Sequence, residues 1–349
     1  MSNRLGSTPE EKPARLLIEK AIATIITIEK YHFSMKKPIV VSGMQPTGQL
    51  HLGNYLGALK NWVDIQNSGN YDCYFFIADY HSLTENYRPE EKHQQIANLL
   101  ADYLAAGLNP EKSTLFVQSQ TPACTELTWI FNTVTPINEL ERMTQFKNKA
   151  KNQALNINVG LFDYPVLQAA DILLYHGQLV PVGQDQIQHV ELTRDIARWF
   201  NNKYQTDYFP EAKPLLTPTP KLMSLSEPEK KMSKSLGDKH WIGIDEKPEI
   251  IDKKIARAVT TPAGVANLRL IYDSFAENMI GPFESANMTQ TKKIIAQGLA
   301  DYFADFRTRK DKLNTDRRQM EEIIAAGRKA TEKIANQTIA EVKKIIGLS

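Results

Sequence analysis

Two short segments, far apart in the chain, constrain its structure more than any other feature. The first, residues 42–54, reads SGMQPTGQLHLGN and follows the β-branched run PIVV at residues 38–41. The second, residues 230–235, reads KKMSKS and lies between stretches containing proline and glycine, which favour a loop. Either segment alone is typical of an ordinary turn or of a solvated basic loop. Together they predict a strand-to-helix turn and a lysine-bearing loop that can close on it.

The first segment has the composition of a strand that runs through a tight turn into a helix. β-branched residues predict a buried strand at 38–41, and Pro46, Gly48 and Gly53 then favour a sharp, uncrowded turn. Apolar residues recur at helical spacing from Tyr55 onward, so we expect a helix to begin near residues 52–54, with His51 and Asn54 at its mouth. Its free N–H groups and dipole would face the turn, an arrangement that binds the phosphates of a nucleotide such as ATP.

The second segment places two ammonium groups on one loop. Lys231 and Lys234 stand three positions apart with a serine between them. Such a pair can close over a triphosphate and neutralise the charge that develops as pyrophosphate leaves.

The length of the chain suggests two domains. A chain of 349 residues exceeds one comfortable core. Its formal net charge of +2 means that any RNA contact would need a local basic patch. The two cysteines, Cys73 and Cys124, give neither a metal spacing nor a disulfide framework, so we expect a reducing cytoplasm. No uninterrupted apolar stretch is long enough to span a membrane.

Three further stretches identify a family. They read ELERMTQFK at 139–147, YPVLQAADILLY at 164–175 and VPVGQDQ at 180–186. With these stretches and the two segments above, the chain resembles the class I aminoacyl-tRNA synthetases, whose signature motifs are of the HIGH and KMSKS types. Asn54 replaces the final histidine of the first motif. Within that class the resemblance is to the bacterial tryptophanyl-tRNA synthetases, and it runs from about residue 37 to about residue 259.

Alternating patterns predict an α/β fold. Strands are expected at 73–79, 114–118 and 179–182, and helices at 90–108 and 185–200, which favours a doubly wound parallel sheet of the Rossmann-like type. Past residue 248 the chain becomes mostly helical, with helices expected at 253–259, 292–308 and 317–346. The resemblance implies that this part recognises the anticodon.

These patterns, together with what the resemblance implies, divide the chain into four parts. We expect an N-terminal extension at 1–34, with a short amphipathic helix and no essential role, and a catalytic domain at 35–222. The KMSKS loop region at 223–245 follows, and then a helical anticodon-binding-like domain at 246–349. The C-terminal helix is expected to pack back on the catalytic domain.

The resemblance also implies a reaction and its partners. ATP with Mg²⁺ would activate L-tryptophan to tryptophanyl-adenylate, and the terminal ribose 2′-hydroxyl of tRNA(Trp) would then attack the adenylate. No structural metal is expected. The active form in this family is a homodimer, with residues 139–147 near the partner subunit.

Site residues follow from the same motifs. The resemblance implies that the nucleotide is seated by Gln45, Pro46, Thr47, Gly53 and Asn54, by Gly183, Gln184 and Asp185 on its ribose side, by Leu222 at the adenine, and by the loop residues Lys231, Met232, Ser233, Lys234 and Ser235. Lys231, Lys234, Thr47 and Asn54 would act in catalysis. Asp171 would accept the indole N–H, while Tyr164, Gln186 and Gln45 would hold the amino acid's ammonium and carboxylate.

Two alternatives stay open. Gln168 stands where many bacterial tryptophan enzymes carry methionine, and a glutamine three residues before the aspartate is typical of tyrosine enzymes. Asp171 could equally accept a phenolic O–H, so a tyrosyl-tRNA synthetase is the nearer alternative. A non-catalytic tRNA-binding paralogue is the other, but it would be expected to lose the motif lysines. The basic stretch at 307–318 is expected to be either a solvated helix connection or a contact with tRNA phosphate.

Overall fold

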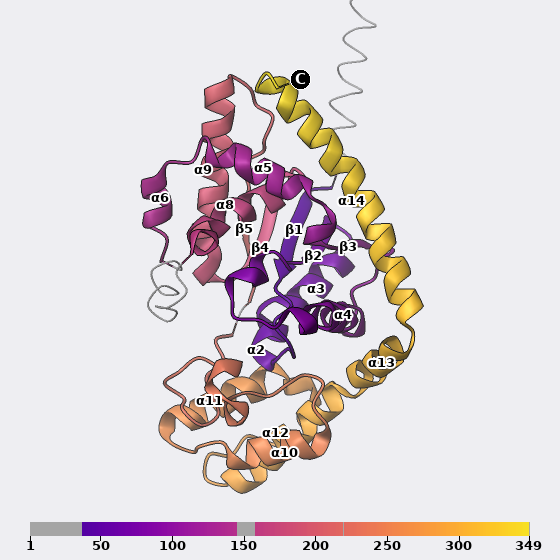
Figure 1. Ribbon diagram of the computed structural model, residues 1–349. Helices are drawn as coiled ribbons and strands as arrows, with labels where there is room; N and C mark the ends of the chain where they lie inside the picture. Colours follow the sequence, from indigo (N-terminus) through magenta and orange to yellow (C-terminus); the bar gives the residue numbers. More distant parts are fainter. Residues whose placement is uncertain (1–36, 145–157, 219, 349) are drawn as a thin grey trace, which may run out of the picture. The chain divides into compact units, whose positions relative to one another are not determined.

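Five parallel strands form one sheet, in the order β3-β2-β1-β4-β5 (Figure 1). The computed structural model describes residues 37–144, 158–218 and 220–348. The strands are β1 (Ile39–Met44), β2 (Asp72–Ile77), β3 (Ser113–Val117), β4 (Leu179–Val182) and β5 (Lys213–Leu216). The predicted doubly wound sheet is therefore confirmed. β5 was not predicted, because it is a four-residue edge strand with a proline at its second position.

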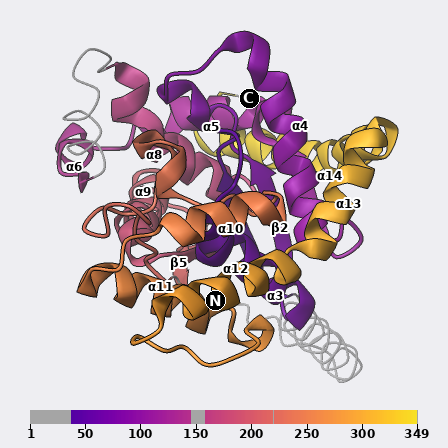
Figure 2. The same ribbon diagram turned by 90° about the horizontal axis from the view of Figure 1, so that it is seen from below.

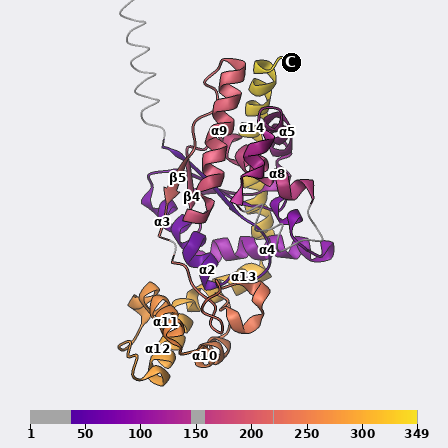
Figure 3. The same cartoon turned by 90° about the vertical axis from the view of Figure 1, so that its left-hand side faces the viewer.

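Alternating side chains of the central strands supply two separate cores. Val40 and Phe75 face one side of the sheet, whereas Val41 and Phe76 face the other. The first side is covered by α3 (Lys60–Ser68) and α4 (Pro89–Ala106), and the second by α5 (Ala123–Asn132), α8 (Val159–Leu173) and α9 (Ile187–Tyr204) (Figures 1 and 3). The sheet is thus buried on both faces, as its continuous apolar strands require.

Helices that follow residue 247 contribute side chains to the first of these cores. They are α10 (Pro248–Arg257), α11 (Pro262–Ser274), α12 (Met288–Tyr302) and α13 (Ala304–Thr315) (Figure 2). The single helix expected at 292–308 is in fact two, because the chain leaves helical geometry at the buried Phe303. α11 was not predicted, since Pro262 and Gly264 near its start resemble a loop, although Thr261 caps it.

The C-terminal helix α14 (Arg317–Ile345) runs along the edge strand β3 (Figure 1). A Cβ at Gly327 would overlap the Leu115 carbonyl oxygen, so the helix backbone lies directly on the strand. Thr338 Oγ1 donates to the Leu174 carbonyl at 2.9 Å and fixes the other end of the helix to α8. Residues Ile39–Ser349 form one compact unit, so the domain boundaries expected at 222 and 245 stay a prediction.

Some predictions lie outside the described residues. The amphipathic helix expected in the first 34 residues is one of them. Of the 139–147 stretch, residues 139–144 are described and include the end of α6 (Ile137–Glu141). In the part of the chain that is described, no helix is both long enough and apolar enough to cross a bilayer.

Candidate active site

The predicted nucleotide segments come together because of the strand order. β1 and β4 are neighbours, and the chain leaves β1 for β2 on one side while β4 continues the sheet on the other. Residues 45 and 183 follow the carboxyl ends of these two strands, at the point where the strand order reverses. Ligands of doubly wound sheets bind in the crevice at such a point.

The helix of the first motif begins where it was predicted. α2 (Leu52–Asn54) continues through a π-helical turn, η1 (Tyr55–Leu59), into α3. His51 is the N-cap: its Nδ1 accepts from the Asn54 N–H at 3.3 Å, and Asn54 Oδ1 accepts from the His51 N–H at 3.1 Å. Leu52 N–H donates to the Ile242 carbonyl at 3.0 Å. The expectation of free N–H groups is therefore wrong for Leu52 and Asn54.

The capping geometry changes how two predicted residues are understood. A Cβ at Gly53 would lie 2.9 Å from Cε1 of His51, so the glycine makes room for the imidazole. The Asn54 side chain is engaged in the cap. Contacts of Gly53 and Asn54 with a nucleotide stay a prediction.

The lysine loop lies against the first motif. Lys234 Nζ donates to the Thr47 carbonyl at 2.8 Å and lies 3.4 Å from Thr47 Oγ1, although the two residues are 187 positions apart. The next residue, Gly48, has a φ of +92°, and a Cβ added to it would lie 4.0 Å from the Lys234 ammonium. Lys231 is exposed. The structure thus brings together the two segments that the sequence predicts to act as one site.

Backbone pairing sets the position of this loop. Met232 N–H donates to the Leu222 carbonyl at 3.0 Å, and Ser224 N–H to the Lys230 carbonyl at 2.9 Å. Leu222 and Met232 are buried in the first core. Ser233 Oγ then caps a single 3₁₀ turn, η5 (Lys234–Leu236), which carries Ser235. A short antiparallel pairing anchored by the buried Leu222 and Met232 therefore holds the segment that carries the two lysines.

His51 is the site residue that sequence reasoning noticed without assigning a role. Burial, and then the charges of Lys234 and Lys231, lower the pKa of His51 to about 4. The imidazole is therefore neutral at pH 7, and since Nδ1 accepts a hydrogen bond, Nε2 carries the proton. The signal that could have found it is its position at the N-cap of the first-motif helix.

This shift predicts an acid sensitivity of the fold. The pKa of His51 in the folded chain lies below its ordinary value of 6.5, so the unfolded chain binds more protons between pH 6.5 and 4. Stability from this group is complete above pH 6.5 and is lost as the pH falls toward 4. His51→Gln should flatten the dependence of Tm on pH in that window, measured by circular dichroism. The exposed His93→Gln is the control and should leave the slope unchanged; equal slopes in all three proteins would contradict the assignment.

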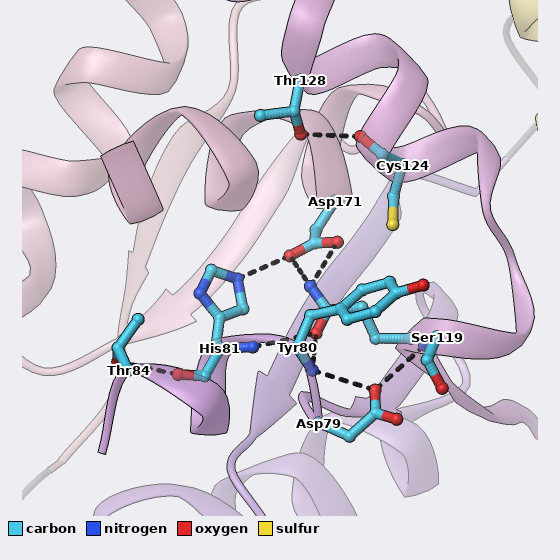
Figure 4. A network of polar contacts seen from close by, with 9 residues as sticks. Asp79, Tyr80, His81, Thr84, Ser119, Cys124, Thr128 and Asp171 are labelled. Carbon is cyan, nitrogen blue, oxygen red and sulfur yellow. Dashed lines mark hydrogen bonds and ion pairs between the residues drawn. The ribbon is translucent and has the colours of Figure 1, made fainter. Parts of the chain in front are cut away.

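A buried carboxylate lies at the centre of a network of polar contacts (Figure 4). Asp171 on α8 is 3 % exposed, and its oxygens accept from His81 Nε2 at 2.8 Å and from Gln118 Nε2 at 2.8 and 2.9 Å. Burial raises the pKa of Asp171, and the hydrogen bonds from His81 and Gln118 oppose this rise. The two oxygens of a carboxylate offer about four acceptor positions, and these hydrogen bonds occupy three of them.

His81 and Gln118 were missed by the sequence analysis. They follow the carboxyl ends of β2 and β3, in the short turns η2 (His81–Thr84) and η3 (Gln118–Gln120). A polar residue just after a predicted strand is the signal that could have found them. Only the fold shows that both reach the same carboxylate.

The remaining predicted residues occupy α8 and the turn after β4. Tyr164 Oη shares a 2.7 Å hydrogen bond with His189 Nε2 on α9. Gln168 is half-buried one turn before Asp171, on the same side of α8. Gly183 precedes the turn η4 (Gln184–Gln186), in which Gln184 is exposed and Gln186 half-buried; the side chain of Asp185 lies outside the description.

Comparison with known proteins gives matches over most of the chain. The family model described as "tRNA synthetases class I (W and Y)" matches residues 34–325. The tryptophan–tRNA ligase of Clostridium perfringens is 39% identical over 328 residues, covering 90% of this chain and 98% of the relative. That of Gloeobacter violaceus is 43% identical over 324 residues, covering 88% and 96%.

Solved structures are similar over the same length. The tryptophanyl-tRNA synthetase of Mycoplasma pneumoniae superposes with a TM-score of 0.79 at 31% identity, covering 90% of this chain and 99% of that one. The Campylobacter jejuni enzyme, complexed with ADP and tryptophan, gives 0.76 at 31% identity and covers 89% and 100%. The resemblance seen in the motifs is confirmed.

Proposed function

We infer that this chain, which belongs to the class I tRNA synthetases of the tryptophan and tyrosine group, is a tryptophan–tRNA ligase. The observation that carries the inference is the contact of Lys234 with Thr47, which joins the two motifs beside the reversal point of a Rossmann-like sheet. The full-length match to tryptophan–tRNA ligases supports the choice of amino acid.

The first step forms an adenylate from tryptophan and ATP. The tryptophan carboxylate attacks the α-phosphorus, a new P–O bond forms, and the bond to the pyrophosphate oxygen breaks. No covalent enzyme intermediate is needed, so the chain contributes position and charge. Lys234 and Lys231 neutralise the phosphates, with Met232, Ser233 and Ser235 shaping the loop. The neutral imidazole of His51 donates a hydrogen bond from its Nε2–H group to a phosphate oxygen.

The nucleotide seat combines both strand ends. Gln45, Pro46, Thr47, Gly53 and Asn54 hold the phosphates, Gly183, Gln184 and Asp185 the ribose side, and Leu222 the adenine. The support is positional, since these residues follow β1 and β4 or line the hairpin that meets them. Thr47 and Asn54 are assigned to catalysis together with the two lysines.

Magnesium is proposed to arrive with ATP. Among the described residues no group of three His, Cys, Asp or Glu side chains could hold a metal ion. A magnesium ion held mainly by the phosphates of ATP and by water needs no such cluster of protein ligands, and this is the usual way in which Mg²⁺ is bound. Magnesium supplies neutralisation of the triphosphate, and the chain's own lysines act beside it.

Selection of tryptophan is assigned to Asp171. Its carboxylate accepts the indole N–H while His81 and Gln118 fix its orientation. Tyr164, Gln186 and Gln45 are proposed to hold the amino acid's ammonium and carboxylate groups. A buried acceptor rejects an analogue that lacks the N–H, because the acceptor would then be left unpaired.

The second step transfers the adenylate's tryptophanyl group to the 2′-hydroxyl of the terminal ribose of tRNA(Trp), with release of AMP. We place this reaction in the cytoplasm, where tRNA and ATP are available. A homodimer is proposed from three exposed apolar side chains on α5, α6 and α8, which are Trp129, Ile137 and Val159, 72 %, 68 % and 80 % exposed. They flank the 139–147 stretch, and sedimentation of the purified chain tests the dimer.

One observation favours a second candidate. Gln168 faces the same side of α8 as Asp171, which is the arrangement expected for a tyrosine enzyme. Charging of total bacterial tRNA with labelled tryptophan and, separately, with labelled tyrosine distinguishes the two ligases. We expect tryptophan to be incorporated; incorporation of tyrosine alone would make Gln168 the better guide.

A further inference from the structure

A buried lysine of the helical part lies between two carboxylates from other parts of the chain. Lys310 on α13 is 8 % exposed, and its Nζ lies 2.6 Å from Asp102 Oδ1 on α4 and 2.5 Å from Asp245 Oδ2. Asp102 is 1 % exposed. Gln49, in the turn of the first motif, donates its Nε2 hydrogen to the other oxygen of Asp245. One ammonium thus connects α13, α4 and the nucleotide turn.

The connection to the turn continues through the backbone. Ile244 N–H donates to the Leu50 carbonyl at 3.0 Å, and Leu52 N–H donates to the Ile242 carbonyl at 3.0 Å. His51 and Gly243 form the bridge between these two bonds. Residues 242–245 therefore run antiparallel to the first motif, and Asp245 lies at the end of that pairing. A displacement of Asp245 would therefore also move the paired segment that carries His51.

The charge of Asp102 also influences Lys234 in the lysine loop. Burial raises the pKa of Asp102 to about 6, against the opposing charge of Lys310. Burial lowers the pKa of Lys234, and the Asp102 carboxylate opposes that shift, so the two groups interact. Burial alone would lower the pKa of Lys310, but Asp102 and Asp245 raise it. Lys310 is therefore a cation that compensates two carboxylates beside the ATP site.

We propose that Lys310 is a positioning residue of the adenylation site, which holds the Gln49 turn through Asp245 and screens Asp102 and Asp245 from the triphosphate. The inference rests on the proposed adenylate chemistry. It also corrects the expectation for the basic stretch at 307–318: Arg309 and Lys312 are exposed, whereas Lys310 is enclosed by protein and is not available to RNA.

The test compares two lysines of the same helix in the full chain. Lys310→Met should raise the KM for ATP in pyrophosphate exchange at least tenfold and leave the KM for tryptophan within twofold. Lys312→Met removes an exposed charge one half-turn away and should leave both constants unchanged. Lys310→Arg keeps the charge and should recover part of the loss. An unchanged KM for ATP in folded Lys310→Met would overturn the inference.

A second variant covers the case in which the single substitution does not fold. Removing one partner leaves uncompensated buried charge, whereas replacing both members of a buried pair is often tolerated. Lys310→Met/Asp102→Leu should therefore fold and keep at least a threefold rise in the KM for ATP, since Asp245 still lacks its anchor. Equal rises in the KM values for ATP and tryptophan would indicate general damage and reject the positioning role.

ATP affinity, measured by isothermal titration calorimetry on the same proteins, separates this inference from the proposed function. If the unmutated chain catalyses no pyrophosphate exchange in the presence of any amino acid, the proposed function fails. The calorimetric comparison then still decides on Lys310: weaker ATP binding by Lys310→Met, with Lys312→Met unchanged, supports the inference, and equal binding overturns it.

Discussion

Lys234→Ala should slow formation of tryptophanyl-adenylate by about 10²–10³-fold while leaving tryptophan binding nearly intact. The ammonium of Lys234 is already directed at the first motif, 2.8 Å from the Thr47 carbonyl. Removing one preorganised donor that stabilises developing charge costs roughly 3–4 kcal/mol of transition-state stabilisation. Single-turnover quench-flow with ATP and tryptophan measures the step, and equilibrium titration with tryptophan measures the binding.

Lys239→Ala is the matched control for this variant. Lys239 is an exposed lysine of the short turn η6 (Asp238–His240), just past the loop. The Lys239→Ala protein should form adenylate at the rate of the unmutated chain. A Lys234→Ala protein that forms adenylate at a near-normal rate would remove Lys234 from the reaction.

Asp171→Ala should abolish the preference for tryptophan over phenylalanine and weaken the fold. Without the carboxylate the indole N–H has no acceptor. The kcat/KM for tryptophan should therefore fall by a factor that corresponds to a few kcal/mol of lost transition-state stabilisation. His81 and Gln118 would lose their shared acceptor, which costs about 1–3 kcal/mol of stability for each buried donor left unpaired. Pyrophosphate exchange with both amino acids measures the first effect, and denaturant unfolding measures the second.

Two further variants separate selection from stability. Asp171→Asn keeps the volume and one acceptor oxygen, so it should be folded and intermediate in preference. Asp163→Asn changes another carboxylate of α8, which accepts from Asn132 at 3.0 Å, and should leave the preference unchanged. If folded Asp171→Ala still prefers tryptophan as strongly as before, another group selects the amino acid.

Local pattern was sufficient for most of the sheet and for the start of the first-motif helix. The runs that became β1, β2 and β3 are β-branched or aromatic and bounded by turn residues. The break at Phe303 was not visible, because the apolar spacing continues across it and only the packing of that ring shows where the helix ends. β5 has no such run, because it is an edge strand that begins with a lysine and has Pro214 at its second position.

The site could be predicted in outline because its motifs have a recognisable composition. The meeting of the lysine loop with the first motif was anticipated, whereas the particular contact of Lys234 with Thr47 and three other pairings were not. His81 and Gln118 meet Asp171, and Lys310 meets Asp102, only after residues more than 50 positions apart have been brought together. Tertiary contacts between single polar residues leave no local pattern, so the fold was needed to find them.

Amino-acid-dependent ATP–pyrophosphate exchange by the purified full chain, run against each of the twenty amino acids, tests the assignment most directly. We predict exchange with tryptophan that exceeds exchange with every other amino acid, tyrosine and phenylalanine included, and that requires no tRNA. Exchange that depends on tyrosine instead, or no exchange with any amino acid, would contradict the assignment as a tryptophan–tRNA ligase.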